Sequence, residues 1–256
     1  MDLGLKGKTA IITGGSRGLG YACSLAMGRE GVEVVICGRD QGTIDKALAV
    51  FKQENIKATG VRADMVQREA AQQVYDHAIR TFGKVDVLIN NVGGGRGSTF
   101  LDTTIEQWYE TFELNLFGSI RLTKLAVPQM IERRWGRIIC IGSIYGREYG
   151  GGMTYMASKA AIMGFTKHLS RQVAQYNVLV NTVAPGSIAH PGGNWQRRLE
   201  QEPEAMKEFI REEMPLGRFG KAEELAAVVT FMVSDKASYL TGAAWNVDGG
   251  QSRSLI

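Results

Sequence analysis

Cysteine and histidine are scarce in this sequence, and their positions exclude two kinds of site. The chain has 256 residues but only three cysteines and three histidines. Cys23 falls in a helical pattern, whereas Cys37 and Cys140 fall in apolar, strand-like runs, so their spacing fits neither a disulfide framework nor a metal site. We expect three small buried hydrophobic residues in a reducing compartment, and no resident metal.

Long apolar runs and clusters of one charge are also missing. No run approaches the roughly 18 residues of a membrane span. The first residues lead straight into a strand and a glycine turn, without the apolar core of a signal peptide. The net charge is only +4, with lysines and arginines spread along the chain. The sequence therefore predicts a cytoplasmic protein with neither a membrane nor a nucleic acid as partner.

What the sequence does contain is an alternation of short apolar runs and longer amphipathic stretches. The runs are rich in β-branched residues and apolar nearly throughout, which is typical of parallel strands covered on both faces. This pattern predicts an α/β protein, a single doubly wound Rossmann-type domain over residues 1–256. Strands are expected at 9–13, 32–37, 85–90, 137–141, 178–183 and 243–247, with a short one before Ala63, and helices at 18–30, 43–54, 67–82, 105–133, 154–176 and 221–233.

The chain leaves this pattern once, between Pro185 and about Pro215. The stretch holds further prolines and a Gly-Gly pair around a charged, helix-like piece. An excursion of this length from a compact domain is usually a lid or a binding loop. We expect a substrate-covering lid at about residues 187–215.

A glycine cluster follows the first strand. Gly14, Gly18 and Gly20 permit a sharp turn and the close approach of a pyrophosphate, and the helix that follows presents its N-terminal amides to that phosphate. The cluster lies at the first strand-to-helix junction of a βαβ pattern, which is the context that dinucleotide binding requires.

The residues after the second strand favour NADP(H). Arg39 stands where NAD-preferring sites usually place a carboxylate, and Arg17 in the glycine loop can reach the same corner. Two guanidinium groups suit a 2′-phosphate. The alternative is that both arginines are solvated and that Asp40 binds the ribose.

Two further strand ends carry candidate cofactor contacts. Asp64 is placed to bond the adenine amino group, with Met65 beside it; alternatively, Asp64 is the N-cap of the helix expected from residue 67. Asn91 and Gly93 end the strand at 85–90, at the carboxyl edge where open α/β sheets bind ligands.

The candidate catalytic residues are Tyr155, Lys159 and Ser143. The i, i+4 spacing puts Tyr155 and Lys159 on one helix face. A lysine cation beside a phenol favours phenolate and lowers the pKa of the tyrosine, which can then exchange a proton with a substrate oxygen. Ser143 lies just past the strand at 137–141, where a long turn would bring its hydroxyl beside Tyr155.

In combination and order, these motifs resemble the short-chain dehydrogenase/reductase family over essentially the whole chain. The segments from 215–220 and 247–250 are similar to those of bacterial 3-oxoacyl-carrier-protein reductases. The resemblance implies that Tyr155 is the general acid or base, that Lys159 also bonds the nicotinamide ribose, and that Ser143 bonds the substrate oxygen. It implies that Asn115 holds a water linked to Lys159, that helices pair between subunits of a homotetramer, and that the cofactor contacts further include Ser16, Leu19, Pro185, Gly186 and Ile188.

The sequence departs from the family pattern at two positions. Val92 stands where the family usually has alanine, and His190 stands where a threonine is common, so the lid is expected to close differently. At the substrate end, Arg96 and Arg147 are candidates for holding an anionic group, although surface or subunit-interface positions are the simpler interpretation. Trp195, Met206 and Phe209 are expected either to form an apolar wall or to pack the inner face of a lid helix.

The expected function is reduction of a ketone or a 3-oxoacyl-type carbonyl with NADP(H). The alternative enzyme is a sugar, polyol or cyclic-alcohol dehydrogenase on the same scaffold, and fold alone does not decide between them. A non-catalytic NADP-binding sensor is disfavoured, because it has no need of all four of Ser143, Tyr155, Lys159 and Asn115.

Overall fold

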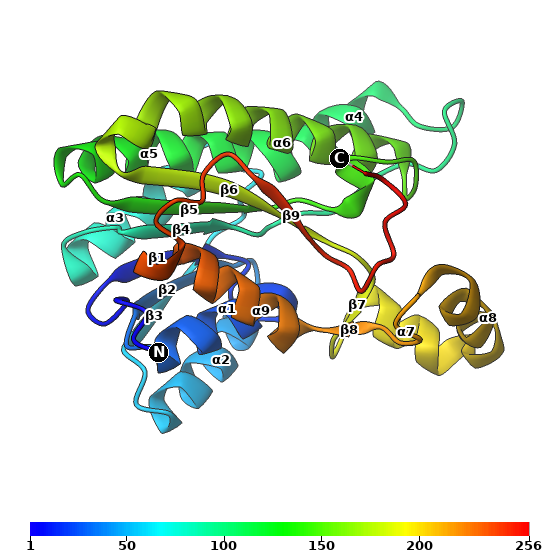
Figure 1. Cartoon of the computed structure of the whole chain (residues 1–256), viewed down its shortest axis with the longest axis horizontal. Coiled ribbons are helices and arrows are strands. Elements are labelled where there is room, and N and C mark those ends of the chain that lie inside the picture. The colour runs from blue at the N-terminus through cyan, green and yellow to red at the C-terminus, as the bar shows by residue number, and fades with distance from the viewer. Residues whose placement is uncertain (256) are drawn as a thin grey trace.

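A seven-stranded parallel sheet lies between two layers of helices in the computed structural model, which describes residues 1–255 (Figure 1). The strand order is β3-β2-β1-β4-β5-β6-β9, and every neighbouring pair is parallel. The predicted doubly wound α/β fold is confirmed. The strands are β1 (Thr9–Thr13), β2 (Glu33–Gly38), β3 (Ala58–Arg62), β4 (Val87–Asn90), β5 (Gly136–Ile141), β6 (Val178–Pro185) and β9 (Ala244–Val247).

Each face of the sheet has its own helical layer and its own core. Helices α1, α2 and α9 cover one face, and α3, α5 and α6 cover the other (Figure 1). Successive residues of β1 point into opposite cores: Ala10 and Ile12 into the first, Ile11 into the second. The interior of β1 is therefore apolar on both faces. The helices are α1 (Gly18–Arg29), α2 (Gln41–Gln53), α3 (Ala70–Phe82), α4 (Ile105–Phe112), α5 (Gly118–Glu132), α6 (Met153–Val173) and α9 (Ala222–Val233).

The prediction of a single helix at 105–133 is wrong. A π-helical turn, Glu113–Phe117, separates α4 from α5. The side chain of Asn115 explains the wide turn, because it is buried and bonds the backbone of Gly94 in two places: Gly94 N donates to Oδ1 at 2.8 Å, and Nδ2 donates to the Gly94 carbonyl at 2.8 Å. Such widened turns are frequent at functional sites.

The helix expected from residue 67 begins at Ala70 instead, and its N-cap is Glu69. Asp64 therefore does not cap it. The carboxylate of Asp64 accepts a bond from Val66 N at 3.3 Å, and Asp64 O accepts one from Gln67 N at 2.8 Å, so residues 64–67 form a tight turn ahead of the helix.

The segment after β6 leaves the sheet at its carboxyl end. It forms β7 (Ile188–Ala189), α7 (Asn194–Gln201) and α8 (Pro203–Glu213), and returns through β8 (Gly220–Lys221), which pairs with β7 (Figure 1). Its own small core consists of Met206, Met214 and Phe219.

The three cysteines are buried and free, as expected. Among residues 1–255, no helix is long and apolar enough to cross a membrane.

Candidate active site

A cleft of about 510 Å³ lies at the carboxyl ends of the central strands. Its walls come from segments far apart in the sequence: the glycine loop after β1, the segment after β4, the turn after β5, helix α6 and the segment after β6. Nine predicted site residues line it, namely Leu19, Asn91, Gly93, Ser143, Tyr155, Lys159, Pro185, Gly186 and Ile188.

The glycine loop has the geometry that a diphosphate needs. Gly14 and Gly18 have φ of +65° and +57°, in the left-handed region that favours glycine. A Cβ on Gly20 would lie 2.4 Å from the Gly14 carbonyl oxygen, so only glycine lets α1 pack this closely on the loop. No side chain caps α1, and its first amides remain available to an anion. These residues fit a dinucleotide.

Thr13 and Asn91 join the glycine loop to β4. The Thr13 hydroxyl accepts a bond from Asn91 N at 2.9 Å, and Asn91 Nδ2 donates to the Thr13 carbonyl at 2.8 Å. The side chain of Asn91 thus holds the loop in place. The sequence reasoning missed Thr13, and its only signal was a threonine at the end of the first strand. Val92 also supports the loop, because a Cβ on Gly14 would lie 3.2 Å from its Cγ2.

A second, polar pocket of about 360 Å³ lies at the ends of β2 and β3, and Arg39 and Asp64 are among its lining residues. Arg17 and Arg39 are exposed, and within residues 1–255 no hydrogen bond or ion pair engages either guanidinium. Asp40, in contrast, caps α2 by accepting a bond from Thr43 N at 2.7 Å. One oxygen of the carboxylate that the alternative assigned to the ribose is therefore already bonded.

Two other predicted cofactor residues face the protein. The Ser16 hydroxyl pairs with that of Thr43 at 3.2 Å, between α1 and α2. Met65 is 3% exposed and packs in the core beneath α3 and α5, while its carbonyl accepts a bond from Arg121. Met65 does not line the second pocket, although its neighbour Asp64 does.

Ser143, Tyr155 and Lys159 meet at the floor of the cleft. Ser143 follows β5 and caps a short 3-10 turn, accepting a bond from Tyr145 N at 3.2 Å. The Tyr155 hydroxyl lies near the side chain of Ser143, which affects the pKa of the phenol through hydrogen bonding. Lys159 lies one turn further along α6, with Nζ 5.5 Å from the centroid of the Tyr155 ring and 2.7 Å from the Ile141 carbonyl that it donates to.

Burial dominates the electrostatics of this group. It raises the pKa of Tyr155, although the hydrogen bond with Ser143 acts in the opposite direction. It also lowers the pKa of Lys159 to about 8. In the chain alone, the shift at Tyr155 is thus opposite to the one expected from the sequence. The physical reason is that loss of hydration penalises both the phenolate and the ammonium ion.

Asn115 lies behind the cleft rather than in it. Besides its two bonds to Gly94, Nδ2 donates to the Ser158 hydroxyl at 2.6 Å. Gly94 lines the cleft, and a Cβ on Gly93 would lie 2.9 Å from Lys159 Nζ and 3.2 Å from Asn115 Oδ1. The π-helical turn therefore fixes the glycine segment against the lysine.

The two candidate substrate arginines are turned away from the cleft. Arg96 pairs with Glu110 at 3.4 Å, and Arg147 donates to Ala244 O at 3.1 Å and to Asn246 Oδ1 at 2.8 Å on the edge strand. Neither lines the cleft. The structure therefore agrees with the simpler interpretation of both.

The other candidate substrate residues come from the segment after β6. The His190 ring lies over Gly18, where an added Cβ would be 2.7 Å from Cε1. Trp195 stacks on Phe209, with ring centroids 4.9 Å apart, and lines the cleft. Met206 is 1% exposed and packs inside this segment. Tyr145 and Asn194 also line the cleft, and the sequence reasoning had assigned no role to Asn194.

Comparisons with known proteins find similarity along the whole chain. The model of the short chain dehydrogenase family matches residues 8–201. The 3-oxoacyl-[acyl-carrier-protein] reductase FabG of Aquifex aeolicus is 36% identical over 253 residues, covering 98% of this chain and 99% of that protein. The protein of the same name from Escherichia coli is 34% identical over 249 residues, covering 97% and 98%.

Solved structures are similar as well. L-sorbose reductase from Gluconobacter frateurii, in a crystal structure with NADPH and L-sorbose, matches with a TM-score of 0.94 at 31% sequence identity and covers 100% of both chains.

Proposed function

The chain belongs to the short chain dehydrogenase family and is an oxidoreductase, and from this premise we propose that it reduces a ketone or a 3-oxoacyl-type carbonyl with NADPH. The observation that carries the proposal is the meeting of Ser143, Tyr155 and Lys159 in one cleft beside an uncapped, glycine-rich helix N-terminus. A non-catalytic NADP-binding sensor would not need these three side chains in one cleft.

The chain's own residues supply position and a proton. The nicotinamide cofactor, when bound, supplies the hydride. Tyr155 donates the proton to the substrate oxygen, and Ser143 bonds that oxygen. Because burial raises the pKa of Tyr155, its phenol is protonated at neutral pH, which is the form that reduction requires. Lys159 bonds the ribose beside the ring. Asn115 maintains the cleft wall and holds a water that links Lys159 to solvent.

The choice of NADPH rests on the second pocket. Arg39 lines this pocket, and both Arg39 and Arg17 of the glycine loop are exposed cations without a protein partner among residues 1–255. A 2′-phosphate supplies the missing anion. The L-sorbose reductase of similar fold was solved with NADPH, which supports the same choice here.

A sugar or polyol substrate is the second candidate, and one observation favours it. The structural similarity to L-sorbose reductase extends over the entire chain. The 3-oxoacyl relatives are somewhat closer in sequence, at 34% to 36% identity. Both candidates interconvert a carbonyl and an alcohol with the same catalytic residues, so they differ in the direction of the reaction and in what the outer cleft holds.

A substrate panel separates these candidates. The purified chain would be given NADPH or NADH with simple ketones, ketoses and 3-oxoacyl thioesters, and NADP⁺ with polyols and cyclic alcohols. Absorbance of the reduced nicotinamide reports turnover. We expect turnover with NADPH and at least one carbonyl class. Tight binding of NADPH without turnover across the panel would favour the sensor.

We further propose that residues 187–215 act as a lid. The segment joins the domain through the short β7–β8 pairing, and Trp195 and His190 reach from it into the cleft. Amide hydrogen exchange in α7 and α8 is expected to slow when NADPH and a substrate analogue bind together. Unchanged exchange at saturation would contradict the proposal.

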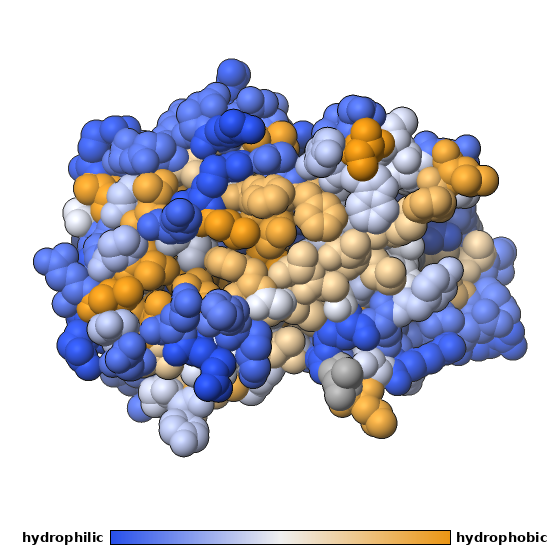
Figure 2. Space-filling model, turned by 90° about the horizontal axis from the view of Figure 1, so that it is seen from above, coloured by the Kyte–Doolittle hydropathy of each residue, from blue (hydrophilic) through white to orange (hydrophobic). Residues whose placement is uncertain are grey.

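We also propose a homotetramer. Hydrophobic residues cross the face formed by α4, α5 and α6 (Figure 2). Phe117 is 44% exposed there, and Phe112, Ile120 and Phe165 are only partly buried. Two-fold pairing of these helices would cover them. Light scattering at micromolar concentration tests this directly, and a mass near the 28.0 kDa of one chain would contradict it.

A further inference from the structure

The segment after β9 returns to the cleft and places a glutamine behind it. Gln251 is 5% exposed and lies against the segment that follows β6. Ser187 N donates to Gln251 Oε1 at 2.7 Å, and Gln251 Nε2 donates to the Ser187 hydroxyl at 3.0 Å. One amide side chain thus bonds both polar groups that Ser187 presents on that side.

Ser187 belongs to the wall of the cleft. It lies between Gly186 and Ile188, and all three line the cleft beside Tyr155. A Cβ on Gly186 would lie 2.7 Å from Gln251 Oε1 and 2.7 Å from Asp248 Cβ. The returning segment therefore packs directly on the back of this wall, and only glycine permits that approach.

The backbone on either side of Gln251 is held by bonds that do not involve Ser187. One carboxylate oxygen of Glu148, in the segment after the Ser143 turn, accepts bonds from Arg253 N at 2.8 Å, Ser254 N at 2.9 Å and the Ser252 hydroxyl at 3.0 Å. Gln251 N also donates to Asp248 O at 3.2 Å. Because its own backbone is fixed on both sides, Gln251 is a rigid support for Ser187.

The wall has few other supports on this side. Gly186 N donates to Val247 O at 3.1 Å, and Ser187 O accepts a bond from Gly220 N at 3.0 Å. Without the Gln251 amide, the buried Ser187 N–H would lose its partner, which typically costs about 1–3 kcal/mol unless the backbone moves to find another. Residues 185–188 are then expected to move until the Ser187 N–H finds another partner.

We propose that Gln251 is a positioning residue that acts through Ser187, holding residues 185–188 in the orientation that binds the nicotinamide end of the cofactor. The inference rests on the proposed function. Gln251 supports this end only, because the second pocket, with Arg39, lies at the ends of β2 and β3.

The test compares two ligands on the full-length chain. Dissociation constants of NADPH and of 2′-phospho-ADP-ribose, which lacks the nicotinamide, are measured by titration calorimetry. In the unaltered protein NADPH is expected to bind more tightly. Gln251→Leu is expected to weaken NADPH about 10-fold, which corresponds to the loss of about 1.4 kcal/mol, and to leave 2′-phospho-ADP-ribose unchanged.

Three other variants sharpen the result. Gln251→Glu keeps the acceptor for Ser187 N, and its second oxygen can accept a bond from the Ser187 hydroxyl, so it is expected to restore most of the NADPH affinity. Arg253→Gln is the matched control, since Arg253 pairs with Glu213 at an exposed site and should affect neither ligand. Ser187→Ala removes only the hydroxyl contact and decides the question if Gln251→Leu does not fold: a loss of about 2- to 3-fold for NADPH alone is expected from one neutral hydrogen bond.

Equal weakening of both ligands by Gln251→Leu, or of neither, would overturn the proposal. Failure of the proposed function would look different, because the unaltered protein would then bind NADPH no more tightly than 2′-phospho-ADP-ribose.

Discussion

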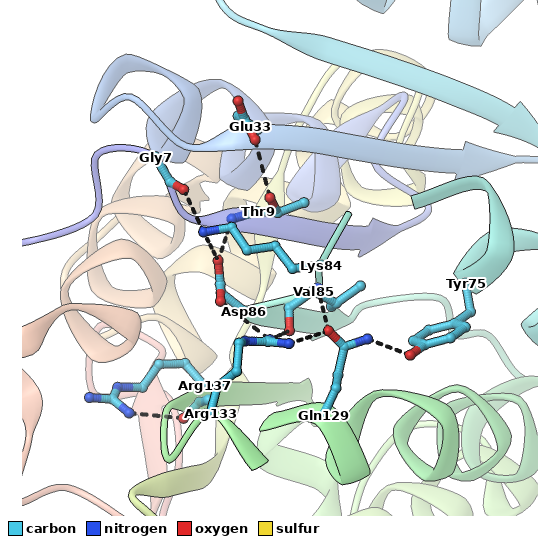
Figure 3. A network of polar contacts seen from close by, with 11 residues as sticks. Gly7, Thr9, Glu33, Tyr75, Lys84, Val85, Asp86, Gln129, Arg133 and Arg137 are labelled. Atoms are coloured by element: carbon cyan, nitrogen blue, oxygen red, sulfur yellow. Dashed lines mark hydrogen bonds and ion pairs between the residues drawn. The ribbon is translucent and has the colours of Figure 1, made fainter. Parts of the chain in front are cut away.

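The two ends of the sheet differ in whether their charged side chains have partners within the protein. At the amino ends, the carboxylate of Asp86, whose side chain is 4% exposed, accepts a bond from Thr9 N at 3.0 Å and pairs with Lys84 at 3.1 Å and Arg133 at 3.4 Å (Figure 3). Gln129 continues this network by accepting a bond from Val85 N at 3.1 Å. At the carboxyl ends, Arg17, Arg39 and the first amides of α1 have no comparable partners within the described chain.

Buried cations show the same contrast. Arg137, at the amino end, is 2% exposed, donates to the carbonyls of Gly136 at 2.9 Å and Asn177 at 3.0 Å, and lies 4.3 Å from the Trp135 ring centroid. Lys159, at the carboxyl end, has a single bond to a carbonyl. A polar group with several partners inside the protein, as Arg137 has although its Nε is without one, serves the fold. A group with few such partners is available to a ligand.

The largest effect we expect to separate the two ends is that of Tyr155→Phe. General acid–base groups contribute about 10²–10⁴-fold to rate, so turnover of any substrate found should fall by that factor. NADPH binding should stay almost normal, because the other cofactor contacts remain. Steady-state kinetics beside calorimetry provide the measurement. Near-normal turnover would mean that Tyr155 is not the proton donor.

Asp86→Ala should have the reverse profile. Removing the carboxylate leaves Thr9 N–H unsatisfied and two cations without their common anion, which should lower the free energy of unfolding by about 2–3 kcal/mol. Both cations are partly exposed, so water limits the loss. Denaturant titration measures it. Asp86→Asn, which keeps the acceptor for Thr9 N, should lose less. A large fall in kcat for the folded variant would break the comparison.

Arg39→Asp tests whether an unpartnered group at the carboxyl end is reserved for a ligand. Loss of a charge-assisted contact with the 2′-phosphate should weaken NADPH about 10- to 100-fold and spare or improve NADH. The ratio of kcat/KM for the two cofactors measures the switch, and Arg62→Gln in the same pocket is a neighbouring comparison. Equal efficiency of the unaltered protein with both cofactors would contradict the assignment.

Lys159→Met should stabilise the chain while it impairs cofactor use. Burial lowers the pKa of Lys159 to about 8, below its ordinary value, so keeping the ammonium in the folded state costs stability below that pH. We expect a gain of about 1–2 kcal/mol at pH 7, after allowing for the lost bond to Ile141 O.

The pH dependence of stability tests the effect of Lys159→Met and its sign. Between the folded pKa near 8 and the unfolded value of about 10.4, the unfolded chain binds more protons, so the stability of the unaltered protein rises with pH. The advantage of Lys159→Met should therefore shrink over this window and vanish above it. Thermal unfolding from pH 7 to pH 11 without cofactor measures it, and a constant difference would contradict the shift.

Local patterns were sufficient to predict the strands and the Tyr155–Lys159 pair. Burial on both faces makes a strand apolar throughout, and i, i+4 spacing on one helix needs no tertiary information. Long-range contacts were not predictable. The π-helical turn depends on Asn115 meeting Gly94, 21 residues away, and the Gln251–Ser187 contact spans 64 residues.

The sequence also gave no sign of which polar groups would be engaged elsewhere. Arg147 was a plausible substrate contact until the structure showed it bonded to Asn246, 99 residues away. The N-cap interpretation of Asp64 failed because the carboxylate turns to Val66, and α3 starts only at Ala70. In both cases a partner that no local pattern identifies decided the outcome.

The wide turn at Glu113–Phe117 makes this part of the chain sensitive to residue count. Each residue of an α-helix advances the backbone by about 100°, so removing one residue from the turn would rotate α4 by about that angle relative to α5. Asn115 would then lose its alignment with Gly94, although every side chain around it remained chemically intact. The number of residues in the turn thus sets the rotation of α4 relative to α5. A one-residue deletion there should impair the protein more than replacement of the exposed Phe117.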